Sequence, residues 1–238
     1  MAKDPLALRR AGLISFAIGI LLGILLILAC AWPDMEAQFY GFVKYTNEPL
    51  KSLRCPVLMT TKDRLPVTIR LNNPNDKVIT RVVQAQFSTR LTVDTVQEKV
   101  ELQPGETKTL SWEVGEENVD LKRFIFARVF TYPATSLPMT DSSCGTMVLR
   151  LPFKGGLVIF YGAVLLAAIG MGAGFWLWLR HSDLSEPAVV TQSWQMRFIA
   201  VVIAVGVLVS YIGIWILAVL ALTLALVSFS VFLMPRKN

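Results

Sequence analysis

The sequence predicts an integral membrane protein with four transmembrane helices and an extracytoplasmic antiparallel β-sandwich inserted between helices 1 and 2. Two observations lead to this fold class. Hydrophobic residues make up 54% of the 238 residues and the mean hydropathy is +0.54, and this apolar excess is concentrated in long blocks. Between the first two blocks lies a polar segment in which apolar and polar residues alternate with the period of two that is typical of β-strands.

The first two apolar blocks, Gly12–Trp32 and Gly156–Leu179, are long enough to cross a membrane. A helix that rises about 1.5 Å per residue needs roughly 18 apolar residues to cross about 30 Å of hydrocarbon. We therefore expect transmembrane helices at 12–32 and 154–179.

The third block, Phe198–Met234, contains 37 residues without a formal charge. As one helix it would be about 55 Å long, nearly twice the hydrocarbon thickness, which is more than tilting normally absorbs. Two crossings fit better, with helices at 194–210 and 214–234 and a reversal near Ser210–Gly213. The alternative is one long tilted helix whose projecting end would leave apolar surface in water.

The charges that flank these helices predict the orientation of the chain. If the chain crosses four times, seven basic residues fall on one side, namely Lys3, Arg9, Arg10, Arg180, Arg197, Arg236 and Lys237. Because positive residues favour the cytoplasmic side, the N-terminus (1–11), the connector (180–193) and the tail (235–238) are expected to be cytoplasmic, and residues 33–153 extracytoplasmic. The net charge of +6 then reflects orientation, and no nucleic-acid partner is expected.

The outer segment contains no N-x-S/T sequon, which favours a bacterial envelope, and hence a cell (inner) membrane, over a eukaryotic lumen. Ile27-Leu28-Ala29-Cys30 resembles a bacterial lipobox, which would make Cys30 a lipidated N-terminus. The long apolar core and the atypical Leu28 instead favour a retained helix with Cys30 near its outer end.

A juxtamembrane segment, 33–47, follows the first helix. Pro33-Asp34-Met35-Glu36 is typical of a helix start, because proline suits the first turn and acidic residues complement the helix dipole. An apolar face then recurs at Trp32, Met35, Phe39, Phe42 and Val43. This pattern predicts a short amphipathic helix at about Pro33–Tyr45, which either rests on the outer membrane surface or packs against the outer domain.

The outer domain, 48–153, reads as a series of short strands. They are expected at Leu65–Leu71, from Val78 to about Thr89, and at Thr92–Val96, Glu98–Leu102, Thr109–Val114, Phe124–Thr131 and Thr146–Leu151. Turn residues separate them, as in NNPNDK and Pro104-Gly105. About seven short strands in about a hundred residues is the spacing of an antiparallel sandwich.

The stretches LNNPND and LQPGETKTLSWEV resemble the strand and turn rhythm of bacterial immunoglobulin-like and fibronectin-like envelope modules. The resemblance covers this segment alone, and it implies an immunoglobulin-like sandwich there.

Two cysteines flank the predicted strands. Cys55 lies where the first strand region begins and Cys144 just before the last strand, so a disulfide could join them where the first and last strands run side by side. Closing this loop would stabilise the domain by about 4 kcal/mol through loop-closure entropy. The alternative is two separate buried thiols.

No catalytic, cofactor or metal site is expected from the residue types present. The chain has one histidine, His181, beside Ser182 and Asp183, and neighbours on a polar connector do not supply the geometry of a triad. No C-x-x-C or H-E-x-x-H motif occurs. The apolar blocks also contain no Asp, Glu, Lys, Arg or His, which disfavours ion or proton transport by this chain alone.

Small residues recur on the predicted helices at spacings that let helix backbones approach closely. They are Gly19, Gly23, Ala163, Ala167, Gly170, Gly174, Ala200 and Ala204. These faces predict helix packing, either within the four-helix unit or against another subunit, a second copy of this chain included.

These features predict a non-catalytic accessory or assembly subunit of a larger envelope membrane complex. Its partners are expected to be the lipid bilayer and other membrane protein subunits, with the sandwich making protein contacts. A ligand-binding or sensing module that works with a separate cytoplasmic partner is the alternative. An enzyme or transporter would need chemistry supplied by another chain.

Overall fold

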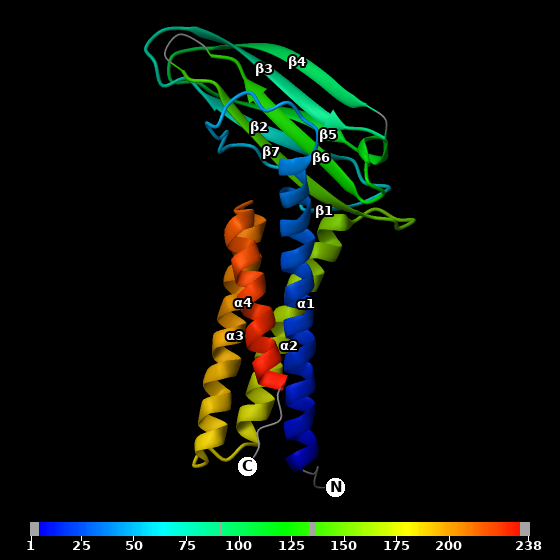
Figure 1. Cartoon of the computed structure of the whole chain (residues 1–238), viewed down its shortest axis with the longest axis vertical. Coiled ribbons are helices and arrows are strands. Elements are labelled where there is room, and N and C mark those ends of the chain that lie inside the picture. The colour runs from blue at the N-terminus through cyan, green and yellow to red at the C-terminus, as the bar shows by residue number, and fades with distance from the viewer. Residues whose placement is uncertain (1–4, 91, 134–136, 234–238) are drawn as a thin grey trace. The chain divides into compact units, whose positions relative to one another are not determined.

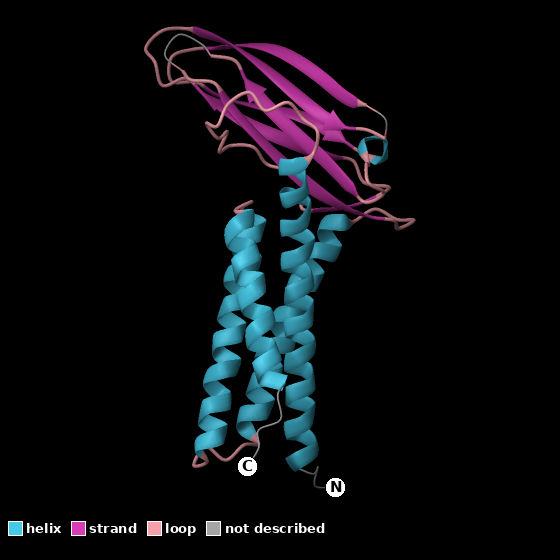
Figure 2. Ribbon diagram, viewed as in Figure 1, coloured by secondary structure: helices cyan, strands magenta, loops and turns pink. Residues whose placement is uncertain are grey.

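The structure is a computed structural model that describes residues 5–90, 92–133 and 137–233. Contacts divide the chain into two compact units, one formed by residues up to Ala31 together with those from Val158 onward, and the other by Trp32–Leu157. In the described residues the first unit is helical and the second contains all the strands (Figures 1 and 2). The predicted tail 235–238 and Lys3 lie outside the described residues.

Four α-helices are present in the described part of the chain, together with a short 3-10 helix at Glu116–Asn118: α1 (Pro5–Phe39), α2 (Gly156–Arg180), α3 (Pro187–Tyr211) and α4 (Trp215–Leu233). Each contains an 18-residue window apolar enough to cross a membrane, with a mean hydropathy between 1.7 and 2.9. The predicted number of helices is therefore confirmed, and all four are candidate membrane spans.

The last apolar block forms two helices, so the alternative of one long helix is wrong. The chain reverses at residues 212–214, where Gly213 has a φ of 79°, a left-handed conformation that glycine adopts without steric cost. The Gly213 N–H donates to the Ser210 carbonyl at 3.0 Å, and the Ile214 N–H donates to the Val209 carbonyl at 3.0 Å. These bonds satisfy carbonyls that the end of α3 would otherwise leave unpaired.

Three helix ends differ from the sequence-based expectation by seven residues: α1 begins at Pro5 rather than Gly12 and ends at Phe39 rather than Trp32, and α3 begins at Pro187 rather than Trp194. α1 continues through Pro33 to Phe39, so no separate helix begins at Pro33. α3 begins at Pro187, seven residues before the predicted 194, because proline fits the first helical turn. The connector between α2 and α3 is therefore only residues 181–186.

The strands form two sheets. In chain order the described strands are β1 (Leu58–Thr60), β2 (Leu65–Asn72), β3 (Ile79–Ser88), β4 (Val93–Leu102), β5 (Thr107–Val114), β6 (Phe124–Thr131) and β7 (Thr140–Leu149). One sheet has the order β1-β7-β6-β3-β4, and the other pairs β2 with β5. All of these strands lie between α1 and α2 in the sequence.

The buried side chains of both sheets form one hydrophobic cluster. On β2, Val67, Ile69 and Leu71 are buried while Pro66, Arg70 and Asn72 are exposed, which is the predicted alternation. A polar contact also joins the sheets, because Trp112 Nε1 on β5 donates to Glu98 Oε1 on β4 at 2.7 Å. The indole is thus buried with its N–H satisfied.

The expectation of an entirely antiparallel arrangement is wrong at one edge, where β1 runs parallel to β7. β1 is followed by β2 of the other sheet, so no hairpin forces it to run antiparallel to its neighbour. The predicted strands Thr92–Val96 and Glu98–Leu102 are a single strand, β4, in which Gln97 pairs with Gln84. β7 begins at Thr140, six residues before the predicted start.

Candidate functional site

Glycines of α1 and α2 form a close helix contact in the described chain. A Cβ added to Gly19 would lie 2.6 Å from the Met171 backbone nitrogen, and one added to Gly170 would lie 3.1 Å from the Gly19 Cα. Ser15 Oγ donates to the Gly170 carbonyl at 3.2 Å. The two backbones are therefore in direct contact, which larger side chains would prevent.

The backbone contact between α1 and α2, which we call the seam, continues toward the N-terminus of α1. A Cβ on Gly174 would lie 2.5 Å from the Phe16 nitrogen, and one on Gly12 would lie 2.7 Å from the Trp178 nitrogen. Gly12 was absent from the predicted packing set. Its spacing of seven residues from Gly19, which places both on one helix face, is the signal that could have identified it.

The other predicted small residues have different surroundings. Ala167 is buried against Gly19, whereas Gly23 faces Ile203 of α3. Ala163 and Ala200 are half-buried.

Ala204 is exposed in the structure, so it lies outside the packed seam. Gly206, two residues later, is buried instead, and its Cα faces Ile27 of α1 and Ala221 of α4. Ala204 and Gly206 are two residues apart and therefore point to different sides of α3. The A-x-x-x-A spacing of Ala200 and Ala204 does not indicate which of these sides is packed.

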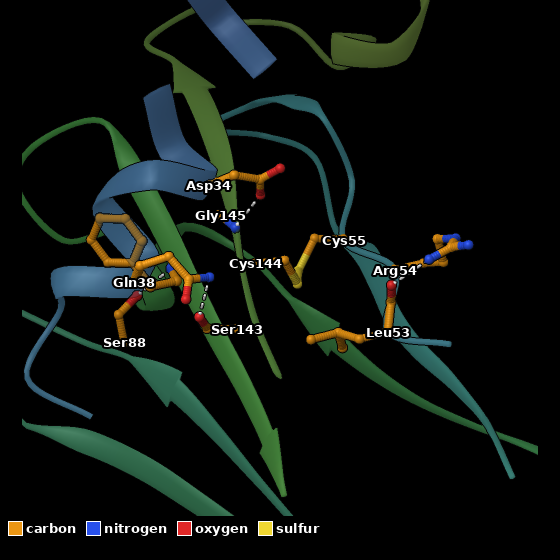
Figure 3. The surroundings of a disulfide bond; sticks show 10 residues. Asp34, Gln38, Leu53, Arg54, Cys55, Ser88, Ser143, Cys144 and Gly145 are labelled. Atoms are coloured by element: carbon orange, nitrogen blue, oxygen red, sulfur yellow. Dashed lines mark hydrogen bonds between the residues drawn. A yellow bond between two sulfur atoms is a disulfide. The ribbon is translucent and has the colours of Figure 1, made fainter. Parts of the chain in front are cut away.

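The structure contains the predicted disulfide between Cys55 and Cys144, so the alternative of two separate thiols is wrong. The bond joins Cys144 of β7 to the chain just before β1, across 89 residues of sequence, with the Cα atoms 6.0 Å apart (Figure 3). We call the unit Trp32–Leu157 the β unit. The disulfide closes it where β1 and β7 lie side by side.

Residues 32–39 of α1 belong to the β unit and are bound to β7. Asp34 Oδ1 accepts the Gly145 N–H at 2.9 Å, and Gln38 Nε2 donates to Ser143 Oγ at 2.9 Å (Figure 3). Gly145 faces the Pro33 backbone so closely that a Cβ would collide with it. A glycine is therefore required where the helix crosses this strand.

The chain after α1 covers the outer face of β6 with aromatic rings. Tyr40 packs on Phe126 with ring centroids 4.6 Å apart, and Tyr45 on Phe130 at 4.4 Å. The Tyr40 hydroxyl donates to Asp120 Oδ2 at 2.6 Å, and burial together with this carboxylate raises the pKa of Tyr40. Of the two predicted placements for this segment, the structure shows packing against the β unit.

A buried ion pair supports the polar first half of β7. Arg128 on β6 binds Asp141 through two hydrogen bonds, Nε to Oδ1 at 2.8 Å and Nη2 to Oδ2 at 2.7 Å. Asp141 Oδ2 also accepts the Tyr45 N–H at 2.9 Å. The pairing lets a strand that begins with polar residues lie in a buried position.

The start of α2 is bound to the β unit through Asp63. Its Oδ1 accepts the Gly155 N–H at 2.9 Å, and its Oδ2 accepts the N–H groups of Gly156 and Thr60 at 2.8 Å each. Burial by itself would raise the pKa of Asp63, but these hydrogen bonds outweigh it and lower the pKa below the ordinary 3.8. Asp63 thereby satisfies N–H groups at a helix start.

The residues around the single histidine each bond locally to backbone or to a neighbour. His181 Nδ1 lies 2.9 Å from the Leu177 carbonyl, Ser182 Oγ donates to the Trp178 carbonyl, and Asp183 accepts from Ser185. The three side chains are not hydrogen-bonded to one another in a triad. Among the described residues no group of three His, Cys, Asp or Glu side chains lies close enough to hold a metal ion.

The outer face of β3 and β4 has an uncharged centre. Gln84 pairs across the strands with Gln97, and Gln86 with Thr95, on the face opposite the buried Val83 and Ala85. The hydroxyl of Tyr132 donates to Gln84 Oε1 at 3.0 Å. We call the surface formed by Val82, Gln84, Gln86, Thr95 and Gln97 the β3–β4 face.

Comparisons with known proteins add no relative that bears on function. No protein family matches the sequence, and no curated protein matches it. Among solved structures, a β-glucosidase from Erythrobacter marinus matches with 20% sequence identity and a TM-score of 0.26. The match covers 37% of this chain and 14% of the glucosidase, and at this score it carries no argument.

Substituting Asp63→Asn tests the hydrogen bonds between Asp63 and the start of α2. The variant loses the anionic acceptor, so we expect the free energy of unfolding at pH 7 to fall by about 1–3 kcal/mol. Because the folded-state pKa of Asp63 lies below 3.8, its stabilisation is complete above that pH and is lost as the pH falls through the folded value. Denaturant unfolding in detergent should therefore show the two proteins converging below about pH 4.

The matched control is Asp76→Asn, which removes an exposed carboxylate from the turn between β2 and β3. An equal loss of stability in both variants would contradict a specific role for Asp63.

Substituting Gly174→Leu tests the seam between α1 and α2. The new side chain meets backbone atoms of Phe16 and Gly12, so we expect Tm in detergent to fall by about 5 °C or more. Gly172→Leu is the control on the same helix, because a Cβ there has no heavy atom within 4 Å. The seam would be disproved if both variants melted at the wild-type temperature.

Proposed function

We propose that this chain is a non-catalytic accessory or assembly subunit of a larger membrane complex in a bacterial envelope. In this proposal the four helices cross the inner membrane, both termini are cytoplasmic, and the two sheets form an extracytoplasmic immunoglobulin-like sandwich. The sandwich makes the contacts with partner proteins, and the helices pack laterally.

The proposal is based on the distribution of non-helical residues along the described chain. The connectors between the last three helices are residues 181–186 and 212–214, whereas Trp32–Leu157 forms a unit of its own. Apart from the β unit, no described segment between helices is long enough to fold as a domain. If the helices lie in lipid, the β unit supplies the surface available to other proteins.

The way the β unit is attached also favours a structural role. It is bound to α1 through Asp34 and Gln38, and to α2 through Asp63, and the disulfide closes it beside β1. These bonds lie within the unit Trp32–Leu157 and fix the residues through which it continues into the two helices. This preorganisation lowers the entropy lost when a partner binds.

The β3–β4 face is the surface that we propose for the partner. Its central pairs are amides and hydroxyls rather than charges, and Tyr132 lies at its edge. Protein interfaces are depleted in charge at their centre and enriched in tyrosine. Charged residues border it at Lys99 and Glu101.

A ligand-sensing module remains the second proposal. The connector of residues 181–186 is too short to hold an output domain, so a sensor would need a separate cytoplasmic protein. Both proposals therefore require a partner chain, and they differ in the side on which it binds.

Cysteine labelling tests the proposed topology. We expect Lys108→Cys, on the exposed face of β5, to react with a membrane-impermeant maleimide in intact cells, and Ser185→Cys to react only after the cells are opened. The chain without an added cysteine gives the background. Labelling of Ser185→Cys in intact cells would overturn the topology.

Purification in mild detergent, with mass-spectrometric identification of co-purifying chains, tests the partner. We expect a stoichiometric membrane protein to be recovered, and the double variant Gln84→Lys/Gln97→Lys to reduce its recovery about tenfold by burying charge. Thr109→Lys/Ser111→Lys, on the outer face of β5, adds the same charge to the other sheet and should leave recovery unchanged. A lone monomer without any stoichiometric partner would rule out the accessory role.

A further inference from the structure

One groove in the β unit has four basic residues and one acidic residue among its nine lining residues. Its volume is about 510 Å³, and two smaller hollows of about 360 and 340 Å³ share some of its lining residues. The five basic residues along these surfaces are Lys62, Arg90, Lys122, Arg123 and Arg150, and all are exposed. We call this surface the basic groove.

The carboxylates in the basic groove do not neutralise it. Glu116 lies 3.8 Å from Lys62, and Asp120 accepts hydrogen bonds from the Tyr40 hydroxyl and the Leu121 N–H. Within the described residues, no carboxylate lies within salt-bridge distance of Lys122 or Arg150. The groove therefore has an excess of positive charge available to an anion.

The backbone that presents Lys122 is strained. Leu121 and Lys122 have φ angles of 45° and 70°, so two consecutive non-glycine residues occupy the left-handed region. The turn is held by the Asp120 N–H, which donates to the Phe124 carbonyl at 2.7 Å. Strain of this kind persists where the surrounding structure fixes a residue in place, and it occurs often at binding sites.

The basic groove lies close in the chain to the start of a candidate membrane span. Arg150 precedes Gly156, the first residue of α2, by six residues, which can span at most about 20 Å. Lys62 adjoins Asp63, whose carboxylate binds the N–H groups of Gly155 and Gly156. If α2 enters the bilayer at its first residues, these cations lie near the lipid headgroups.

Apolar residues beside the cations favour a lipid over a soluble anion. Phe153 is 54% exposed and Leu157 37% exposed, and both lie on the short stretch between Arg150 and the first turn of α2. Pro152 and Leu151 line the groove itself. Exposed aromatic and aliphatic groups next to cations are typical of surfaces that contact the membrane interface.

We propose that the basic groove binds the phosphate of an anionic phospholipid headgroup in the outer leaflet, with Lys122 and Arg150 as the principal ligands. Arginine and lysine bind phosphate through charge-assisted hydrogen bonds, and the exposed Phe153 would contact the acyl boundary. This inference rests on the membrane topology proposed above, but not on a partner protein.

Native mass spectrometry of the full chain in mild detergent tests the inference. The probes are dioleoyl phosphatidylglycerol and dioleoyl phosphatidylcholine at equal concentration. We expect several-fold more bound phosphatidylglycerol, and a decrease of about tenfold in its binding for Lys122→Gln/Arg150→Gln. The charge-preserving variant Lys122→Arg/Arg150→Lys should keep the selectivity.

The matched control, Lys77→Gln/Lys108→Gln, removes two exposed positive charges elsewhere in the β unit and should bind as the wild type does. Equal binding of the two lipids, or equal losses in the groove and control variants, would overturn the inference. Displacement of the lipid by inorganic phosphate at equal concentration would show that the anion is soluble, which also overturns the lipid assignment. Recovery of a partner protein is a separate readout, so the two proposals can fail independently.

Discussion

A helix that crosses hydrocarbon must hydrogen-bond its backbone N–H and C=O groups within the chain, and this requirement applies to all four candidate membrane spans. The four apolar helices meet it through their own hydrogen bonds, and the short reversal at Gly213 pairs the last carbonyls of α3. Backbone groups need partners from outside the helices at the points where a helix joins the β unit. At the start of α2 the carboxylate of Asp63 supplies the missing acceptors, and beside β7 the end of α1 is held by Asp34.

β7 is the strand on which these connections depend. Its side chains accept hydrogen bonds from Gln38 of α1 and from the Tyr45 N–H in the segment after it, and its Cys144 is disulfide-bonded to Cys55 before β1. Arg128 pairs with its first buried residue, Asp141. A strand with so many side-chain partners can be polar and still lie within the sheet, although the buried hydroxyl of Thr146 on this strand has no hydrogen-bond partner in the described residues.

The elements predicted from the sequence are those whose pattern arises within the element itself. The apolar blocks, the alternation of β2 and the turn near Gly213 depend on local residues. The polar start of β7 was missed because its partners, such as Arg128 and Gln38, are distant in the sequence. Pro33 has the pattern of a helix start, but in the structure α1 continues through it. The contact that Pro33 makes there is with Gly145, which is also distant in the sequence.

The contact between α1 and α2 shows the same limit in the helical unit. Spacing alone identified Gly19, Gly170 and Gly174, but it also selected Ala204, which is exposed. A small residue permits close approach without requiring it, and the partner helix decides whether the approach occurs. The basic groove is still harder to foresee, because Lys122 and Arg150 belong to separate turns that only the folded sheets bring together. Function in this chain is therefore expected to reside in surfaces that folding assembles, rather than in a motif of adjacent residues.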